Sequence, residues 1–158
     1  MSASYGTTTL QTVPPNQPVA FADISCPCTE GLIFKKGAGV FLLASNAPAG
    51  GSCSCGCRKM YLTDYEVEVH LNVQIPEDGE VGEIRMAIAL DGVVDPESVM
   101  IANPTEVETA DNVGTSIIVS VPSLCGCESI AVVNAGDEDV EIVNGSIVFD
   151  YAGVRRIR

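Results

Sequence analysis

The most constraining feature of this 158-residue chain is a long stretch of two-residue alternation. Polar side chains fill every second position of this stretch, namely Asp64, Glu66, Glu68, His70, Asn72 and Gln74. Apolar side chains fill positions in the opposite phase, namely Tyr61, Tyr65, Val67, Val69, Leu71, Val73 and Ile75. Because successive residues of an extended strand point to opposite faces, the pattern predicts one long strand with a buried face and a wetter face.

Shorter runs rich in Val, Ile and Leu recur between Gly, Pro, Asn and Asp clusters, which is typical of strands joined by turns. We expect strands near 19–24, 31–35, 39–45, 60–75, 83–90, 98–102, 114–121, 128–134, 139–144 and 146–151. Pro76–Gly79 and Asp91-Gly92 predict tight turns, and Asn144-Gly145 predicts the pivot of a closing hairpin. Helix should be minor, since no sustained 3.6-residue periodicity occurs. The sequence therefore predicts an all-β, antiparallel two-sheet sandwich of jelly-roll type.

One domain accounts for most of the chain, which is 46% hydrophobic and 18% charged. We expect the jelly roll over 19–158. Residues 1–18, rich in Thr, Ser, Gln and Pro, predict an extended N-terminal arm outside the core, suited to attachment. The same segment shows no secretory signal pattern, so we expect synthesis in a host cytoplasm.

Charge and histidine content disfavour several function classes. A net charge of −13 would repel nucleic-acid phosphates, so we expect no nucleic-acid partner. Apolar runs are shorter than the roughly 20 residues of a membrane-spanning helix, so we expect no membrane association. His70 is the only histidine, which leaves little for acid–base catalysis near neutral pH. We therefore expect a protein that is not an enzyme.

The stretch from Tyr65 to Gly92 resembles part of the tumour-necrosis-factor/C1q-like jelly roll. It has the long strand, the Pro-x-x-Gly turn at Pro76–Gly79, and the Asp-Gly-x-x-x-Pro hairpin at Asp91–Pro96. Ser116–Pro122 matches a later Ser-Ile-Ile-Val-Ser-Val-Pro strand. Further similarity lies in the opening segment 15–21 and in 140–151, which is similar to the closing hairpin of the family.

The resemblance is to the form found in collagen-like spore-surface proteins and in small bacteriophage virion proteins. It implies a trimeric, non-enzymatic surface domain used for display, adhesion or particle decoration. Because the chain carries no collagen-like Gly-x-y stalk, the virion members are the better match. The family's binding residues vary in place, so the resemblance assigns none here.

Seven cysteines form three C-x-C clusters: Cys26 and Cys28; Cys53, Cys55 and Cys57; Cys125 and Cys127. Residues i and i+2 of an extended segment point the same way, so each cluster can present its sulfurs on one side. Disulfides formed after release, a structural zinc site and free thiols all remain open. The odd number leaves at least one thiol outside any intramolecular disulfide.

Three other groups of charged or ionisable residues each have a functional and a purely structural interpretation. His70 with Glu66 and Glu68 could bind a metal or act as a base, but a solvated strand face is the simpler interpretation. The acidic run 137–139 lacks calcium-loop spacing and predicts a solvated turn. The tail Arg155–Arg158 is either frayed or a tether to an acidic partner.

These observations favour a homotrimeric structural protein on a bacteriophage surface, as a capsid-decoration or head-fibre protein. We expect Ile147, Phe149 and Tyr151 of the last strand at the trimer interface, and the N-terminal arm on the capsid or another virion protein. The alternatives are a module that recognises host-surface glycan, for a phage or a spore surface, and a cysteine-cluster metal-binding protein.

Overall fold

The computed structural model describes residues 2–26, 32–47, 60–123 and 127–157. Within these ranges the chain is built from strands, one 3-10 turn and connecting loops. The elements are β1 (Ser2–Thr7), β2 (Gln11–Val13), β3 (Asp23–Cys26), β4 (Ile33–Lys36), β5 (Val40–Ala44), β6 (Tyr61–Gln74), β7 (Ile84–Leu90), β8 (Val93–Val94), η1 (Pro96–Ser98), β9 (Met100–Ala102), β10 (Asp111–Pro122), β11 (Cys127–Asn134) and β12 (Val140–Arg156).

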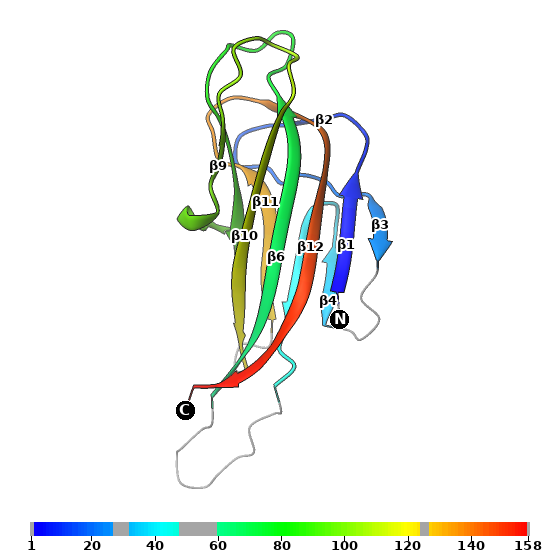
Figure 1. Ribbon diagram of the computed structural model, residues 1–158, viewed down its shortest axis with the longest axis vertical. Helices are drawn as coiled ribbons and strands as arrows, with labels where there is room; N and C mark the ends of the chain where they lie inside the picture. Colours follow the sequence, from blue (N-terminus) through cyan, green and yellow to red (C-terminus); the bar gives the residue numbers. More distant parts are fainter. Residues whose placement is uncertain (1, 27–31, 48–59, 124–126, 158) are drawn as a thin grey trace, which may run out of the picture.

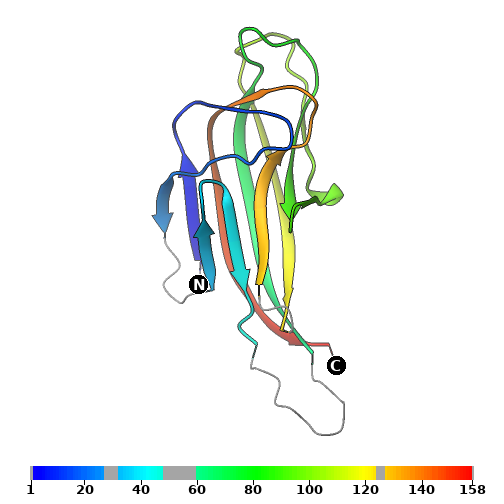
Figure 2. The ribbon, with the colours of Figure 1, turned by 180° about the vertical axis from the view of Figure 1, so that it is seen from behind.

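The strands form two antiparallel sheets packed face to face. The first sheet has the order β10-β6-β12-β1-β3, with β2 also paired to β12. The second sheet has the order β4-β5-β11-β7-β8, with β9 also paired to β7. Figure 1 shows the first sheet in front, and Figure 2 shows the second sheet from behind. The prediction of an all-β two-sheet sandwich is confirmed.

The alternation in β6 directs the packing as expected. Tyr65, Val67, Val69 and Val73 are fully buried and point between the sheets, whereas Glu66 and His70 are exposed on the outer face. The second sheet contributes Phe41, Met86, Ile88, Ile130 and Val132 to the same core. Burying a side chain of this size stabilises the fold by about 1.5–3 kcal/mol.

Aromatic rings concentrate in one part of this core. The ring of Phe41 lies 4.7 Å from that of Tyr5 and 5.0 Å from that of Phe149, centroid to centroid. Phe21 joins the group at 6.1 Å from Phe41. These rings come from both sheets and from the segment before β3, so they tie the N-terminal residues to the sandwich.

The expectation that residues 1–18 form an arm outside the core is wrong for much of that segment. Residues 2–7 form β1, which pairs with β12 on one side and β3 on the other. Ala3, Tyr5 and Thr7 alternate inward and are buried. Farther on, Pro18 bridges to Val133 of β11. The segment is polar in composition, but its inward positions fill the core.

The predicted hairpin at Asn144-Gly145 is also wrong, because β12 is one continuous strand with a register irregularity between Ile142 and Asn144. Gly145 is needed for close packing instead of for a turn. A Cβ there would lie 2.5 Å from Leu71 Cδ2 and 2.9 Å from the carbonyl oxygen of His70.

The prediction of a trimer interface is wrong for two of its three residues, which all lie on β12. Ile147 and Phe149 are 0% exposed and lie between the two sheets of a single chain. A side chain that is fully buried in the monomer has no surface to offer a second subunit. Tyr151 is half-buried, with its ring edge-on to Tyr65 and its hydroxyl accepting a hydrogen bond from the Asn46 amide.

The other two turns predicted from the sequence, at Pro76–Gly79 and Asp91-Gly92, are confirmed. The amide of Gly79 donates to the Pro76 carbonyl at 2.9 Å. Asp91 and Gly92 have φ of 48° and 82° and join β7 to β8 as a two-residue hairpin. Positive φ at both central residues is the geometry that Asp-Gly favours in such hairpins.

Candidate functional site

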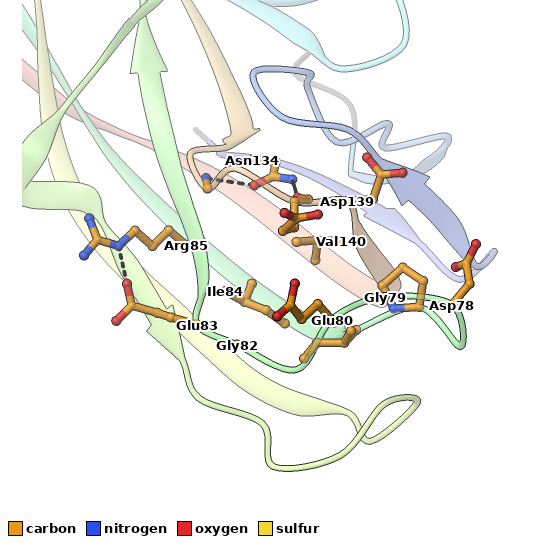
Figure 3. Close-up of a pocket in the computed structure, with 14 residues that line it drawn as sticks. Asp78, Gly79, Glu80, Gly82, Glu83, Ile84, Arg85, Asn134, Asp139 and Val140 are labelled. Atoms are coloured by element: carbon orange, nitrogen blue, oxygen red, sulfur yellow. Dashed lines mark hydrogen bonds and ion pairs between the residues drawn. The ribbon is translucent and has the colours of Figure 1, made fainter.

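The acidic end of the sandwich holds a cavity of about 160 Å³ between the β6–β7 and β11–β12 connections. Figure 3 shows its lining, in which Arg85 pairs with Glu83. The other carboxylates there are Asp78, Glu80, Glu138 and Asp139. The fully buried Asn134 holds the floor, since its amide donates to the carbonyls of Val13 and Glu138 and its Oδ1 accepts from Gly136.

The geometry of this end is that of an acidic surface and does not provide a metal centre. Every polar atom of the Asn134 side chain is engaged within the protein, so it has none to aim at a ligand. Among the described residues, no group of three or more His, Cys, Asp or Glu side chains could hold a metal ion. The acidic run 137–139 is exposed at this end, as the solvated-turn interpretation expects.

The outer face of the first sheet, called the polar face below, is organised in rows that cross β10, β6 and β12. Residues in one row are directly paired in register. The rows are Asn112–Asn72–Asn144, Gly114–His70–Ser146, Ser116–Glu68–Val148 and Ile118–Glu66–Asp150. The two rows through Asn72 and His70, called the upper rows, contain no carboxylate. The two rows through Glu68 and Glu66, called the lower rows, contain three.

His70 lies in a wide, open hollow of about 710 Å³ in the upper rows. A Cβ at position 114 would lie 2.9 Å from His70 Nδ1, so Gly114 leaves room for the imidazole. Asn72 donates to Asn144 Oδ1 at 2.8 Å, which fixes two of the three row amides. Glu66 and Glu68 lie in the rows below His70, on the solvated strand face that the sequence predicted.

The lower end of the polar face contains an ion pair that uses the basic C-terminal segment. Arg155 Nε donates to Asp64 Oδ2 at 2.7 Å, and the Ser120 hydroxyl donates to Asp64 Oδ1 at 2.5 Å. Burial raises the pKa of the Asp64 carboxyl, but these hydrogen bonds and the Arg155 charge outweigh burial and lower it. Arg155 is therefore bound within its own chain and is part of β12.

The polar face also carries one large exposed apolar side chain. Ile118 is 69% exposed and lies in the same row as Glu66 and Asp150. Its neighbours along β10 on this face are Ser116 and Ser120. Alternation in the sequence was the available signal, because Ile118 shares its phase with Ser116 and Ser120, whereas Ile117 shares its phase with Val119 and Val121.

The outer face of the second sheet, called the apolar face below, was not singled out by sequence reasoning. Ala89, Ala131 and Val133 form a second small cluster there, with Val40 packed against it. They line a hollow of about 260 Å³ together with Asn16, Pro18, Gly92, Val94 and Ser129. The alternation Ile84–Leu90 was the available signal, because its opposite positions include Ala87 and Ala89 as well as charged residues.

Glu128, in the inward phase of β11, and Asp91, in the β7–β8 turn, form an acidic pair. Burial, and secondarily the charge of Asp91, raise the pKa of the Glu128 carboxyl. Asp91 is fixed near Glu128 because its Oδ1 accepts from the Ser129 amide at 2.9 Å.

The cysteine predictions fall mostly outside the described residues. Cys28, Cys53, Cys55, Cys57 and Cys125 lie outside the described residues, so disulfides and zinc among them stay predictions. Cys127 begins β11 as an exposed free thiol, and the backbone of Cys26 ends β3 opposite Ser4.

In the part of the chain described here, no helix is both long enough and apolar enough to cross a membrane. No protein-family model matches the sequence, and no curated protein is similar to it.

The two-sheet architecture with its strand order defines a jelly-roll domain. Among solved structures, the globular domain of zebrafish complement 1qA protein matches with a TM-score of 0.51 and 10% identity over 96% of each chain. The chain therefore has the C1q-like jelly-roll fold, and the resemblance seen in the sequence is confirmed at the level of fold.

Two carbohydrate-binding modules of family 35 also match. One, from Clostridium thermocellum, has a TM-score of 0.33 and 13% identity over 91% of this chain and 90% of that one. The other, from Cellvibrio japonicus Abf62, has a TM-score of 0.37 and 10% identity over 93% and 96%. Since both scores are below 0.5, these two likenesses bear on neither fold nor ligand.

Proposed function

We propose that this chain is a non-enzymatic structural protein that forms a homotrimer on the surface of a bacteriophage particle. The C1q-like fold over nearly the whole chain supports the trimer, since the sequence resemblance implies trimeric display domains. The observation that carries the proposal is Ile118, which is 69% exposed on the outer side of β10, an edge strand of the first sheet. A subunit contact would bury it, and each buried Å² of apolar surface contributes about 25 cal/mol.

The exposed Ile118 on the polar face favours a contact with a different surface of a neighbouring copy, as in a closed ring. A closed ring of three copies uses two different surfaces of each subunit, so no face need match itself. Val93 and Ile101, along the β8–β9 edge, are 72% and 49% exposed and offer the second apolar surface. The trimer then packs the β8–β9 edge of one copy over Ile118 of the next.

The trimer is tested by measuring the native mass of the wild-type protein and of Ile118→Asp. We expect about three times 16.5 kDa for the wild type and a folded monomer for the variant. Leu10→Asp is the matched control, because Leu10 is 55% exposed in the β1–β2 loop and lies outside the proposed contact. A monomeric wild type, or a trimeric Ile118→Asp, would contradict the proposal.

Attachment to the particle is proposed through the exposed loop between β1 and β2, the part of residues 1–18 that leaves the core. Thr8, Thr9 and Leu10 are exposed there. We expect Leu10→Asp to remain trimeric but to bind purified particles less well, whereas the wild type co-sediments with them. Particles that contain no copy of this chain by mass spectrometry would refute the virion role while leaving the trimer intact.

Glycan recognition is the second candidate, and the hollow around His70 favours it. In a chain of net charge −13, this hollow is lined by amides, hydroxyls and an imidazole without a carboxylate. Such neutral donors and acceptors suit a hydroxyl-rich ligand. The hollow lies about 13 Å along the strand from the Ile118 row, so it can stay open in the trimer. Glycan-array binding that Asn112→Ala abolishes and Ser120→Ala preserves would support this candidate.

A further inference from the structure

The apolar face is unusual because it lies on the outside of the sandwich. On the polar face, most outward positions carry polar or charged side chains. On the apolar face, the described outward positions of β4, β5 and β8 include Phe34, Leu42, Val40 and Val94. Phe34 is 47% exposed and Val94 is 37% exposed. Ala89, Ala131 and Val133 in the middle of the face are already buried, so the apolar surface that a partner could cover lies at Phe34 and Val94 on the two edge strands.

The face has a projection at one edge and a hollow toward the other. Phe34 projects from β4, an edge strand of the second sheet. The hollow of about 260 Å³ lies over β11, β7 and β8, where the small side chains of Ala89 and Ala131 leave room. A cavity of about 150 Å³ already accommodates a benzene ring, so this hollow has space for the ring of a phenylalanine.

Charges on the two edges are of opposite sign. Lys36 is exposed on β4, in the same outward phase as Phe34. Asp91 and Asp95 flank β8 at the opposite edge, and Glu97 follows in η1. The face is therefore basic beside its projection and acidic beside its hollow.

A two-fold axis parallel to the strands brings these features together. Such a rotation turns a second copy face to face with the first and places β4 of each over β8 of the other. It also keeps each row at the same height. Phe34 lies in the row of Leu42 and Ser129, and Lys36 lies in the row that continues through Val40, Ala131 and Ala89 to Val94.

We propose that two copies of this chain pack their apolar faces together around this two-fold axis, with Phe34 of each copy in the hollow of the other. Lys36 then faces the Asp91–Asp95 edge of the second copy. The contact is isologous, since each copy contributes the same patch. Sheets stack face to face about 10 Å apart with strand directions within about 30°, and the small side chains of Ala89 and Ala131 suit that spacing.

The expected strength follows from the size of the face. Five strands about 4.8 Å apart and five residues of about 3.4 Å give about 400 Å² for each copy. About 800 Å² in total is below the range of stable interfaces, so a pair of monomers associates weakly. On a trimer, three such faces point outward, and neighbouring trimers on one surface gain affinity through multivalency. Only this last step depends on the proposed function.

Sedimentation velocity over a concentration series, from about 10 μM to about 1 mM, tests the contact. We expect the wild-type mass to double reversibly, to a dimer from a monomer or to a hexamer from a trimer. Phe34→Ser should lower the association constant at least tenfold, and Lys36→Glu should lower it less. Leu10→Ser, which changes an exposed leucine outside the face, should behave as the wild type.

The variants separate this contact from the trimer. The Ile118→Asp variant should no longer form a trimer, but its mass should still double as the concentration is raised. The Phe34→Ser variant should remain a trimer, and its mass should not double. A wild-type mass that does not change with concentration overturns the proposal, as does a Phe34→Ser protein that doubles like the wild type. Binding of detergent micelles or of a capsid protein to this face, without doubling, also overturns it and identifies another occupant.

Discussion

Gly145 shows how one residue sets the spacing of two strands. Its missing Cβ would lie 2.5 Å from Leu71 Cδ2 and 2.9 Å from the His70 carbonyl oxygen. We expect Gly145→Ala to destabilise the fold by about 1–3 kcal/mol, the usual cost of overpacking. Gly6→Ala on the neighbouring strand is the control, because its Cβ would lie 3.5 Å from the nearest atom. Equal urea midpoints for the two variants would contradict the packing role of Gly145.

Asp64 gives a pH-dependent contribution to stability. Its folded-state pKa is lowered below 3.8, because the hydrogen bonds from Ser120 and Arg155 outweigh the effect of burial. Such a carboxyl stabilises the fold above its unfolded-state pKa, and this stabilisation is lost as the pH falls through the folded-state pKa. At about pH 7 we expect Asp64→Asn to be less stable by at most about 1 kcal/mol, since Arg155 is largely exposed.

Urea unfolding at a series of pH values measures this contribution. The difference between wild type and Asp64→Asn should shrink as the pH falls below about 3.8, and Arg155→Gln should show the same trend. A difference that is constant down to about pH 2 would mean that the Asp64 charge has no part in it.

Among the elements, β1 decides whether the N-terminal segment belongs to the core. Tyr5 is 4% exposed and its ring lies 4.7 Å from Phe41. We expect Tyr5→Ala to cost about 3–5 kcal/mol, as truncation of buried aromatic side chains does. Ser4→Ala, on the outer side of the same strand, should cost less than 1 kcal/mol. If both variants melt at the wild-type temperature, β1 is not docked in solution.

Strands could be predicted from the sequence where large apolar residues recur at the inner positions, whether the outer residues are polar, as in β6, or apolar, as in β5. In β6, alternation over fourteen residues leaves one register that buries the apolar set. In β1, the inner positions are Ala3, Tyr5 and Thr7, so the contrast between faces is weak and composition suggests a loop. In β12, Asn144-Gly145 matches a turn signal, but the close approach of Leu71 that requires the glycine comes from another strand.

The features of the candidate surfaces also divide into those that the sequence could predict and those that it could not. His70, Glu66 and Glu68 could be placed on one outer face, because that placement needs only strand periodicity. The rows that set Asn112 beside Asn72 need the register between β10 and β6, which no short-range pattern contains. Strand periodicity also places Ile118 on this face, in phase with Ser116 and Ser120, but its neighbours Glu66 and Asp150 in the row again need the register.

On the scale of the whole molecule, net charge opposes the proposed trimer. Each copy brings a charge of −13, and the Ile118 row adds Glu66 and Asp150 to the proposed trimer contact. Repulsion between these carboxylates weakens the trimer at low ionic strength and is screened within about 3 Å at 1 M salt. Dissociation of the wild-type trimer should therefore decrease as salt is raised.

Glu66→Gln isolates this effect, because it removes one carboxylate per copy beside Ile118 and keeps the side-chain size. We expect it to tighten the trimer at low salt by about 0.2–1 kcal/mol, up to about fivefold in the dissociation constant, with the advantage lost at high salt. Glu77→Gln removes the same charge from the exposed β6–β7 turn, outside both proposed surfaces, and should have a smaller effect. If Glu66→Gln weakens the trimer, Glu66 forms a favourable contact there, and the polar face meets a basic surface of its neighbour instead of the β8–β9 edge.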